Sequence, residues 1–286
     1  MAGNLATVEK MLASVWQAAV KRAGEEVAEM QDMMAAEGCG HADVQPWDYR
    51  FWNEKVRKAK FALDDGMLKP YLQLQRLRDG MFWVAQQLYH PPLPGVNSYV
   101  VFRNAVSVRY GYTFHLLADV PLYHPDTSCY EVRSSDGAHV GLWYFDPYAR
   151  AGKRSGAWMS EYRSQHAHEN STPIVSNNCN FTRPAPGQCA LLSWDDAVTL
   201  FHEFGHALHG LSSRVMYRPL AGTATTRDHV ELPSQLNEHW LQTPELLQKY
   251  ACHVTDGSAL PMELVKKIEA ASTFAQGFGT SPSFPH

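Results

Sequence analysis

The chain has 286 residues, a formal net charge of −4 and 45% hydrophobic residues, a composition that predicts a folded protein with a large core. No block of Lys and Arg stands out, and the longest apolar runs are too short for a membrane span, so we expect no nucleic-acid or membrane partner. The five cysteines contain no C-x-x-C pair and the N-terminus lacks a secretory signal pattern, which favours reduced thiols in a cytoplasmic protein.

Apolar residues at helical spacing predict helices first, followed by a smaller β region. The early helices are expected at about 4–36, 47–62 and 70–89. From about 97 to 147 the residues become β-branched and aromatic, with Asp136-Gly137 as a hairpin signal, and 172–183 predicts a further strand. Later helices are expected at about 193–213, from Thr226 through the following residues, and at 244–253 and 261–274. We therefore predict a mainly α fold with a small β-sheet (α+β), divided into 1–90, 91–185 and 186–286.

The segment TLFHEFGHALHGL carries the most specific chemical pattern. His202 and His206 are four residues apart on a predicted helix, so both imidazoles project from one face and can bind one Zn²⁺. In the H-E-x-x-H arrangement the intervening carboxylate, Glu203, acts as general base toward water whose pKa zinc lowers to about 7. Ser193 can cap this helix, and acidic residues in its first turn suit the helix dipole. The alternative interpretation is an ordinary amphipathic helix rich in histidine.

A catalytic zinc site needs a third protein ligand. The metzincin pattern is excluded, because it requires glycine and histidine where this chain has His209 and Ser212. A straight helix carries His209 too far along to share the metal, so we expect a core histidine or one that supports a ligand. Glu231 lies on the next predicted helix, where it can face both imidazoles, and it completes a His₂Glu set.

Two further acids on that second helix could orient a ligand imidazole. Asp228 lies one turn before Glu231, and an acid at a plain helix start is the alternative interpretation. Glu238 lies two turns after Glu231 on the same face, and a surface salt bridge is the alternative. Pro233 either kinks this helix or belongs to its first turn.

Several stretches of the chain resemble the thimet oligopeptidase family of zinc peptidases. The stretches are LFHEFGHALHGL, AGTATTRDHVELPSQLNEHW, YFDPYARAGKRSGAWM, WDYRFWNEKVRKAKF and KPYLQLQRLRDGMFWVAQQLY. The amino-acid sequence of these stretches is most similar to that of bacterial-type peptidyl-dipeptidases (dipeptidyl carboxypeptidases), which remove dipeptides from peptide C-termini. The resemblance implies a zincin-like H-E-x-x-H domain lining a deep channel, one Zn²⁺ held by His202, His206 and Glu231, and Glu203 as base. It also indicates that TPIVSNNCNF is an edge strand that binds extended peptide through Ser176, Asn177 and Asn178, with an ordinary core strand as the alternative.

The chain also departs from the family pattern. Family members are longer at both ends, and no part of 279–286 matches the catalytic segment that carries a glycine-rich loop and oxyanion-stabilising Tyr and His residues. Residues 90–108 resemble an insertion. The chain is thus expected to be a truncated piece whose zincin-like domain is incomplete.

We therefore expect a monomeric zinc metallopeptidase that hydrolyses short unstructured peptides and releases C-terminal dipeptides. A broader endo-oligopeptidase of the same family is the first alternative. A zinc-binding fragment with impaired catalysis is the second, and exchange of Glu203 for Gln distinguishes it, because only an active enzyme would lose turnover.

Overall fold

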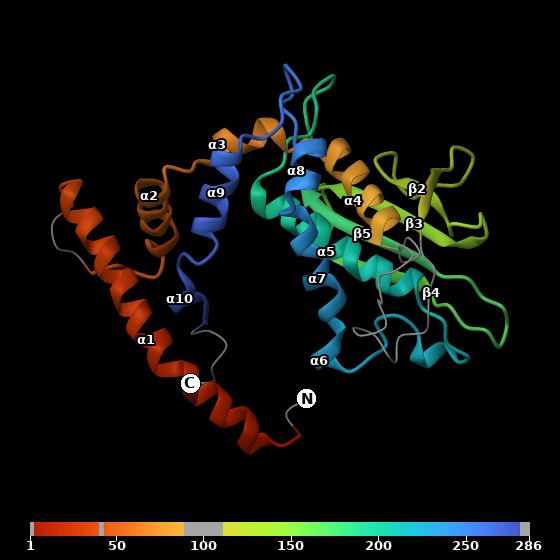
Figure 1. The fold of residues 1–286 in the computed structure, drawn as a ribbon, viewed down its shortest axis with the longest axis horizontal. Helices are drawn as coiled ribbons and strands as arrows, with labels where there is room; N and C mark the ends of the chain where they lie inside the picture. Colours follow the sequence, from red (N-terminus) through yellow and green to blue (C-terminus); the bar gives the residue numbers. More distant parts are fainter. Residues whose placement is uncertain (1–2, 40–42, 89–110, 281–286) are drawn as a thin grey trace, which may run out of the picture. The chain divides into compact units, whose positions relative to one another are not determined.

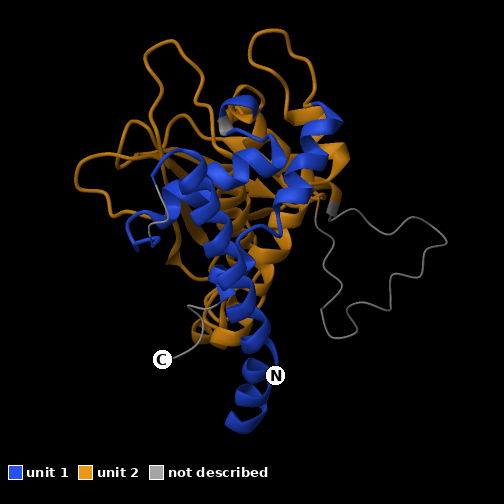
Figure 2. Cartoon of the chain, turned by 90° about the vertical axis from the view of Figure 1, so that its left-hand side faces the viewer, with its two compact units in different colours: residues 1–67, 261–286 blue, residues 68–260 orange. Residues whose placement is uncertain are grey.

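The computed structural model describes residues 3–39, 43–88 and 111–280 of the chain. Two compact units form within it, Met1–Met67 with Pro261–His286 and Leu68–Leu260 (Figure 2). The insertion predicted at 90–108 lies outside the described residues, as does the early part of the predicted β region.

The first unit is helical. It contains α1 (Leu5–Ala36), α2 (Tyr49–Phe61), α9 (Met262–Ala271) and α10 (Gln276–Thr280), and α3 (Asp65–Leu68) follows at its boundary (Figure 1). Met30, Met34, Trp52 and Val56 form its buried cluster. The buried Glu26 carboxylate accepts hydrogen bonds from the backbone N–H groups of Gly277 and Phe278, both at 3.0 Å, and so fastens α10 to α1. The helices predicted at 4–36, 47–62 and 261–274 are confirmed, whereas α10 was not predicted.

The second unit combines helices with one small sheet, which confirms the α+β class (Figure 1). Its helices are η1 (Lys69–Tyr71), α4 (Leu74–Leu88), α5 (Trp194–Leu211), η3 (Arg218–Leu220), α6 (Arg227–Val230), α7 (Leu232–Leu241) and α8 (Pro244–Tyr250). Its strands are β1 (Thr113–Leu116), β2 (Ser128–Arg133), β3 (His139–Tyr148), β4 (Trp158–Arg163) and β5 (Ile174–Phe181). Pro233 belongs to the first turn of α7, so the predicted second helix is divided at Glu231 instead of being kinked.

The five strands form a mixed sheet in the order β1-β2-β3-β5-β4. β2 and β3 form the predicted hairpin, whose Gly137 has a φ of +83° that favours glycine. β5 pairs with β3 in parallel and with β4 in antiparallel orientation, so that Asn177 lies opposite both Phe145 and Met159. The interior position of β5 explains why most of its side chains are buried, the polar Ser176, Asn177 and Asn178 included, since a strand paired on both sides beneath a helix is shielded from water.

Helix α5 covers one face of this sheet, where it contacts β3, β4 and β5. Helix α4 packs against β1 and α5, and α7 packs on α5. Four aromatic rings from four elements meet in the core, Phe82, Phe114, Trp143 and Phe204, with neighbouring centroids 4.2–6.2 Å apart. The site helix is therefore anchored by its apolar face to a rigid sheet.

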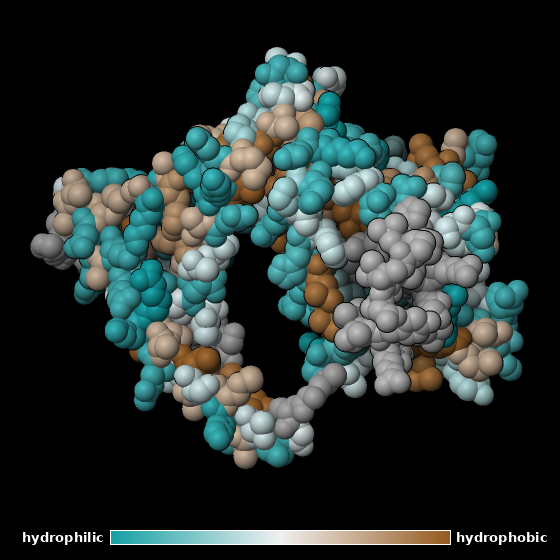
Figure 3. Space-filling model, viewed as in Figure 1, coloured by the Kyte–Doolittle hydropathy of each residue, from teal (hydrophilic) through white to brown (hydrophobic). Residues whose placement is uncertain are grey.

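The surface is mostly hydrophilic in the view of Figure 3, with brown atoms visible over α7. Three exposed apolar side chains four residues apart, Leu232, Leu236 and Trp240, form a stripe along this helix. All five cysteines are free, and three of them are buried. Among the described residues, no helix combines the length and apolar character that crossing a bilayer requires.

Candidate metal centre

Helix α5 begins at a capping box, as its sequence predicts. The Ser193 hydroxyl accepts a hydrogen bond from the Asp196 N–H, and the Asp196 carboxylate accepts one from the Ser193 N–H. These bonds satisfy backbone donors that have no partner within the helix, and the acidic first turn suits the helix dipole. The start of the helix, and hence the direction of each later side chain, is fixed locally.

A close helix contact determines where the second part of the site lies. A Cβ added at Gly205 would lie 2.6 Å from Ser234 Cα and 2.8 Å from the Pro233 carbonyl oxygen, so only glycine permits this approach of α5 to α7. The Asn237 amide donates to the Phe201 carbonyl at 2.6 Å and crosslinks the same two helices. Glu231, which immediately precedes α7, is thereby held against α5.

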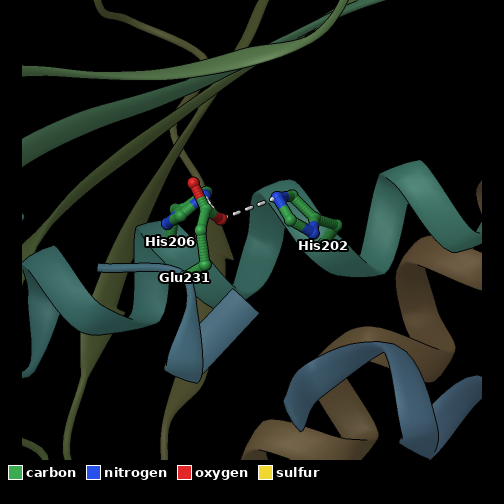
Figure 4. Close-up of side chains that lie close together, drawn as sticks. All are labelled: His202, His206 and Glu231. Carbon is green, nitrogen blue, oxygen red and sulfur yellow. Dashed lines mark ion pairs between the residues drawn. The ribbon is translucent and has the colours of Figure 1, made fainter. Parts of the chain in front are cut away.

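Three side chains from α5 and the α6–α7 junction converge on one point (Figure 4). Glu231 Oε2 lies 3.3 Å from His202 Nε2 and 3.0 Å from His206 Nε2. One ligand atom from each residue lies within 4.8 Å of the others. Within the described part of the chain, no other group of at least three His, Cys, Asp or Glu side chains meets this criterion. Two imidazole nitrogens and one carboxylate oxygen form a donor set that suits Zn²⁺.

Two neighbouring groups orient these side chains. The Ser234 hydroxyl lies 2.8 Å from Glu231 Oε2, and Glu238 Oε1 lies 2.6 Å from His202 Nδ1. The second contact leaves His202 Nε2 free to face Glu231, and a carboxylate that accepts from the other ring nitrogen is a common support of a metal-ligating histidine. Among the described residues, the buried Nδ1 atom of His206 has no hydrogen-bond partner.

Electrostatics distinguish the two carboxylates of the site. Burial, with a smaller contribution from the Glu231 charge, raises the pKa of Glu203 to about 7, although His202 opposes this rise. Burial also acts to raise the pKa of Glu231, but the Ser234 hydroxyl and the neighbouring His206 and His202 outweigh it, so this pKa lies below its ordinary value. Burial lowers the pKa of His206, which favours the neutral imidazole that a metal requires. The site therefore combines an ionised carboxylate with a buried one suited to accept a proton.

These side chains line a pocket of about 390 Å³. Its walls are Ala157, Trp158, Met159, His202, Glu203, His206, Thr223, Val230 and Glu231. The first part of β4 and the residue before it thus form one wall, and α5, the loop residue Thr223 and the end of α6 with Glu231 form the others. The sequence prediction missed β4 and this wall. The only signal was the Gly-rich turn before WMSEYR, because the strand itself alternates poorly.

The remaining predicted residues lie outside the convergent set. His209 is on α5, where burial lowers its pKa, and its ring centroid lies 6.4 Å from that of His229. Asp228 is an exposed residue in the first turn of α6, and it forms no hydrogen bond or ion pair with another described residue.

The expectation that 172–181 is an edge strand is wrong. β5 pairs with β3 on one side and β4 on the other, so its backbone groups are already used. Ser176, Asn177 and Asn178 are all at most 5% exposed. The Asn177 side chain accepts from Trp143 Nε1 at 2.7 Å and donates to the Glu203 carbonyl at 2.6 Å, which ties α5 to the sheet. The alternative interpretation, a core strand, describes β5 correctly.

Comparison with known proteins agrees with this geometry. The family model described as peptidase family M3 matches residues 1–282. The chain is 42% identical to the dipeptidyl carboxypeptidase of Escherichia coli over 92% of its own length and 36% of that protein, and similarly to the Salmonella typhimurium protein over 90% and 35%. It is 32% identical to oligopeptidase A of Escherichia coli over 96% of its length and 38% of that protein. The chain thus spans about a third of the length of these relatives. With a family model that covers nearly all of its residues, the chain belongs to peptidase family M3.

Proposed function

We propose that the chain carries the metal half of a zinc metallopeptidase site that hydrolyses short peptides. The observation that supports this proposal most is the convergence of His202, His206 and Glu231 beside the buried Glu203, all on the wall of one pocket. The two imidazoles and Glu231 would hold the ion. When bound, zinc would polarise the scissile carbonyl and lower the pKa of water.

Glu203 is proposed as the general base. Glu203 is among the residues that line the pocket, and its Oε2 is buried without a hydrogen-bond partner among the described residues. A pKa near 7 matches a base that takes a proton from water and passes it to the leaving amine near neutral pH. Asn177 holds the backbone of Glu203 and Glu238 holds His202, so both positions are fixed by neighbouring side chains.

Peptide substrate is proposed to extend the sheet at β4. This strand is last in the sheet order, and its first residues line the pocket. The free backbone edge of such a strand can pair with an extended peptide. A folded protein seldom presents an extended segment that is free to pair in this way. β4 therefore replaces β5 as the proposed peptide-binding strand. Release of C-terminal dipeptides is the preferred activity because of the 42% identity to dipeptidyl carboxypeptidases, and broader endopeptidase action is the alternative.

A second candidate is a metal-binding fragment with impaired catalysis. One observation favours it, namely that α7 exposes an apolar stripe formed by Leu232, Leu236 and Trp240. Measurement of zinc stoichiometry, together with cleavage of an internally quenched peptide with and without chelator, tests both candidates. Chelator-sensitive cleavage that Glu203→Gln abolishes supports the peptidase. One bound zinc per chain without cleavage supports the metal-binding fragment. If the chain binds no zinc when an equimolar amount is supplied, both candidates are refuted.

A further inference from the structure

The direction of β4 determines where the end of a bound peptide would lie. The strand begins at Trp158, beside the pocket, and runs away to Arg163. A peptide that adds to its free edge in antiparallel orientation points its C-terminus past Trp158 toward the preceding loop, 150–156. A C-terminal dipeptide in extended form spans about 7 Å, so its carboxylate would lie close to this end of the strand.

The loop before β4 contains three basic residues, of which two are already paired. Arg150 makes a two-pronged contact with Asp146, at 2.6 and 2.8 Å, and Lys153 lies 3.0 Å from the same carboxylate. Asp146 is 1% exposed, so both cations are committed to a buried partner. Their contribution is to hold the loop in place.

Arg154 is different, since it is exposed and forms no ion pair with any described carboxylate. Its guanidinium carbon lies 4.7 Å from the ring centroid of Trp158, a residue that lines the pocket. The Asn180 amide donates to the carbonyls of Arg154 and Gly156, at 2.8 and 2.6 Å, which fixes the backbone beneath it. Arg154 is thus an exposed cation without an ion-pair partner among the described residues, and it is stacked on a residue that lines the pocket.

The opposite end of β4 is less suited to a carboxylate. Glu161 is partly buried there, and the guanidinium of Arg163 already donates to the carbonyl and hydroxyl of Thr172, at 2.6 and 2.9 Å. A peptide in the reverse direction would bring its C-terminus toward an acid and an occupied arginine. The charge distribution therefore favours the antiparallel orientation.

We propose that Arg154 binds the C-terminal carboxylate of the peptide and thereby sets release of a dipeptide. This inference rests on the proposed peptidase function and adds a specificity-determining residue to it. The planar guanidinium can donate two parallel hydrogen bonds to a carboxylate while it stays stacked on Trp158. A peptide with a C-terminal amide keeps the strand pairing and loses only the charged contact.

Binding of matched peptides to the full chain tests the proposal. The probes are two fluorescent peptides of one sequence, ending in a carboxylate or a carboxamide, and the protein is the zinc-loaded Glu203→Gln variant, which prevents turnover. Fluorescence anisotropy is expected to show about tenfold tighter binding of the acid. Adding Arg154→Gln should bring the acid to the affinity of the amide and leave the amide unchanged. Arg154→Lys keeps the positive charge but lacks the planar guanidinium with its two parallel donors, so it should retain part of the preference for the peptide acid over the amide.

Arg227→Gln is the matched control, since Arg227 is another exposed arginine near the pocket and should leave the preference intact. Equal binding of acid and amide by the parent, or a preference that survives Arg154→Gln, overturns the role of Arg154 while peptide binding itself stands. If Arg227→Gln instead abolishes the preference for the peptide acid, the C-terminal carboxylate binds on the side of the pocket near α6, and the role of Arg154 is likewise overturned. A zinc-loaded chain that binds neither peptide refutes the proposed peptide site together with this inference.

Discussion

The buried carboxylate of Glu203 makes the stability of the metal-free chain depend on pH. Burial raises its pKa to about 7, which is about 2.5 above its ordinary value of 4.5. Since each pKa unit corresponds to about 1.36 kcal/mol, ionising this group in the folded chain costs up to about 3 kcal/mol. Glu203→Gln removes the ionisation and keeps the side chain's shape, so it isolates this cost.

The sign follows from proton binding in the two states. Below about pH 4.5 the carboxyl is protonated whether the chain is folded or not, and it adds no pH dependence. Between about pH 4.5 and pH 7 the unfolded chain binds fewer protons, so the free energy of unfolding of the parent falls as pH rises. The glutamine variant lacks this loss, and its advantage over the parent should grow by about 3 kcal/mol up to about pH 8.

Urea unfolding with excess chelator, followed by tryptophan fluorescence at several pH values, measures this difference. Subtracting the variant from the parent at each pH removes the contribution of the titrating groups that do not interact with Glu203. Glu9→Gln, which deletes an exposed carboxylate, should show no comparable growth. A difference between parent and Glu203→Gln that stays constant from about pH 4.5 to pH 8 would refute the desolvation argument. Bound zinc should shrink the difference, because its charge favours the ionised carboxylate.

Three further substitutions test the scaffold of the site. Gly205→Ala should lower the free energy of unfolding in a urea titration by about 1–3 kcal/mol and weaken zinc binding, because the added Cβ meets the backbone of α7. Gly24→Ala is the control: no atom lies within 4 Å of its added Cβ, so it should be neutral or slightly stabilising in the same titration. Glu238→Gln should weaken zinc binding about 10–100-fold in a competition titration with a chelating dye, since the carboxylate contacts a ligand imidazole, and unchanged affinity would contradict this role. Asn177→Ala should cost about 3 kcal/mol in urea unfolding, because a buried indole N–H and a helix carbonyl lose their partner, and a cost below about 1 kcal/mol would show that water replaces it.

Local sequence determined the elements that depend on near neighbours. Helical spacing, the Ser193–Asp196 capping box and the H-E-x-x-H pattern defined α5 and the face that carries His202 and His206. Asp136-Gly137 defined the β2–β3 hairpin, because a two-residue turn signal needs no distant contact. The choice of Glu231 relied on a return helix after a loop, and the structure brings its carboxylate to both imidazoles.

Only the tertiary structure decided which strand lies at the sheet edge. The sequence predicts β5 as a strand, but its place between β3 and β4 depends on pairing with residues up to 33 positions away (Tyr148 with Phe181), which periodicity does not encode. β4 was missed because the residues of its partly exposed strand alternate poorly. Its value to the site comes from its position, since it places Trp158 and Met159 on the pocket wall opposite α5. The sequence by itself thus identified the three side chains that converge, and non-local packing decided which strand lies at the sheet edge beside them.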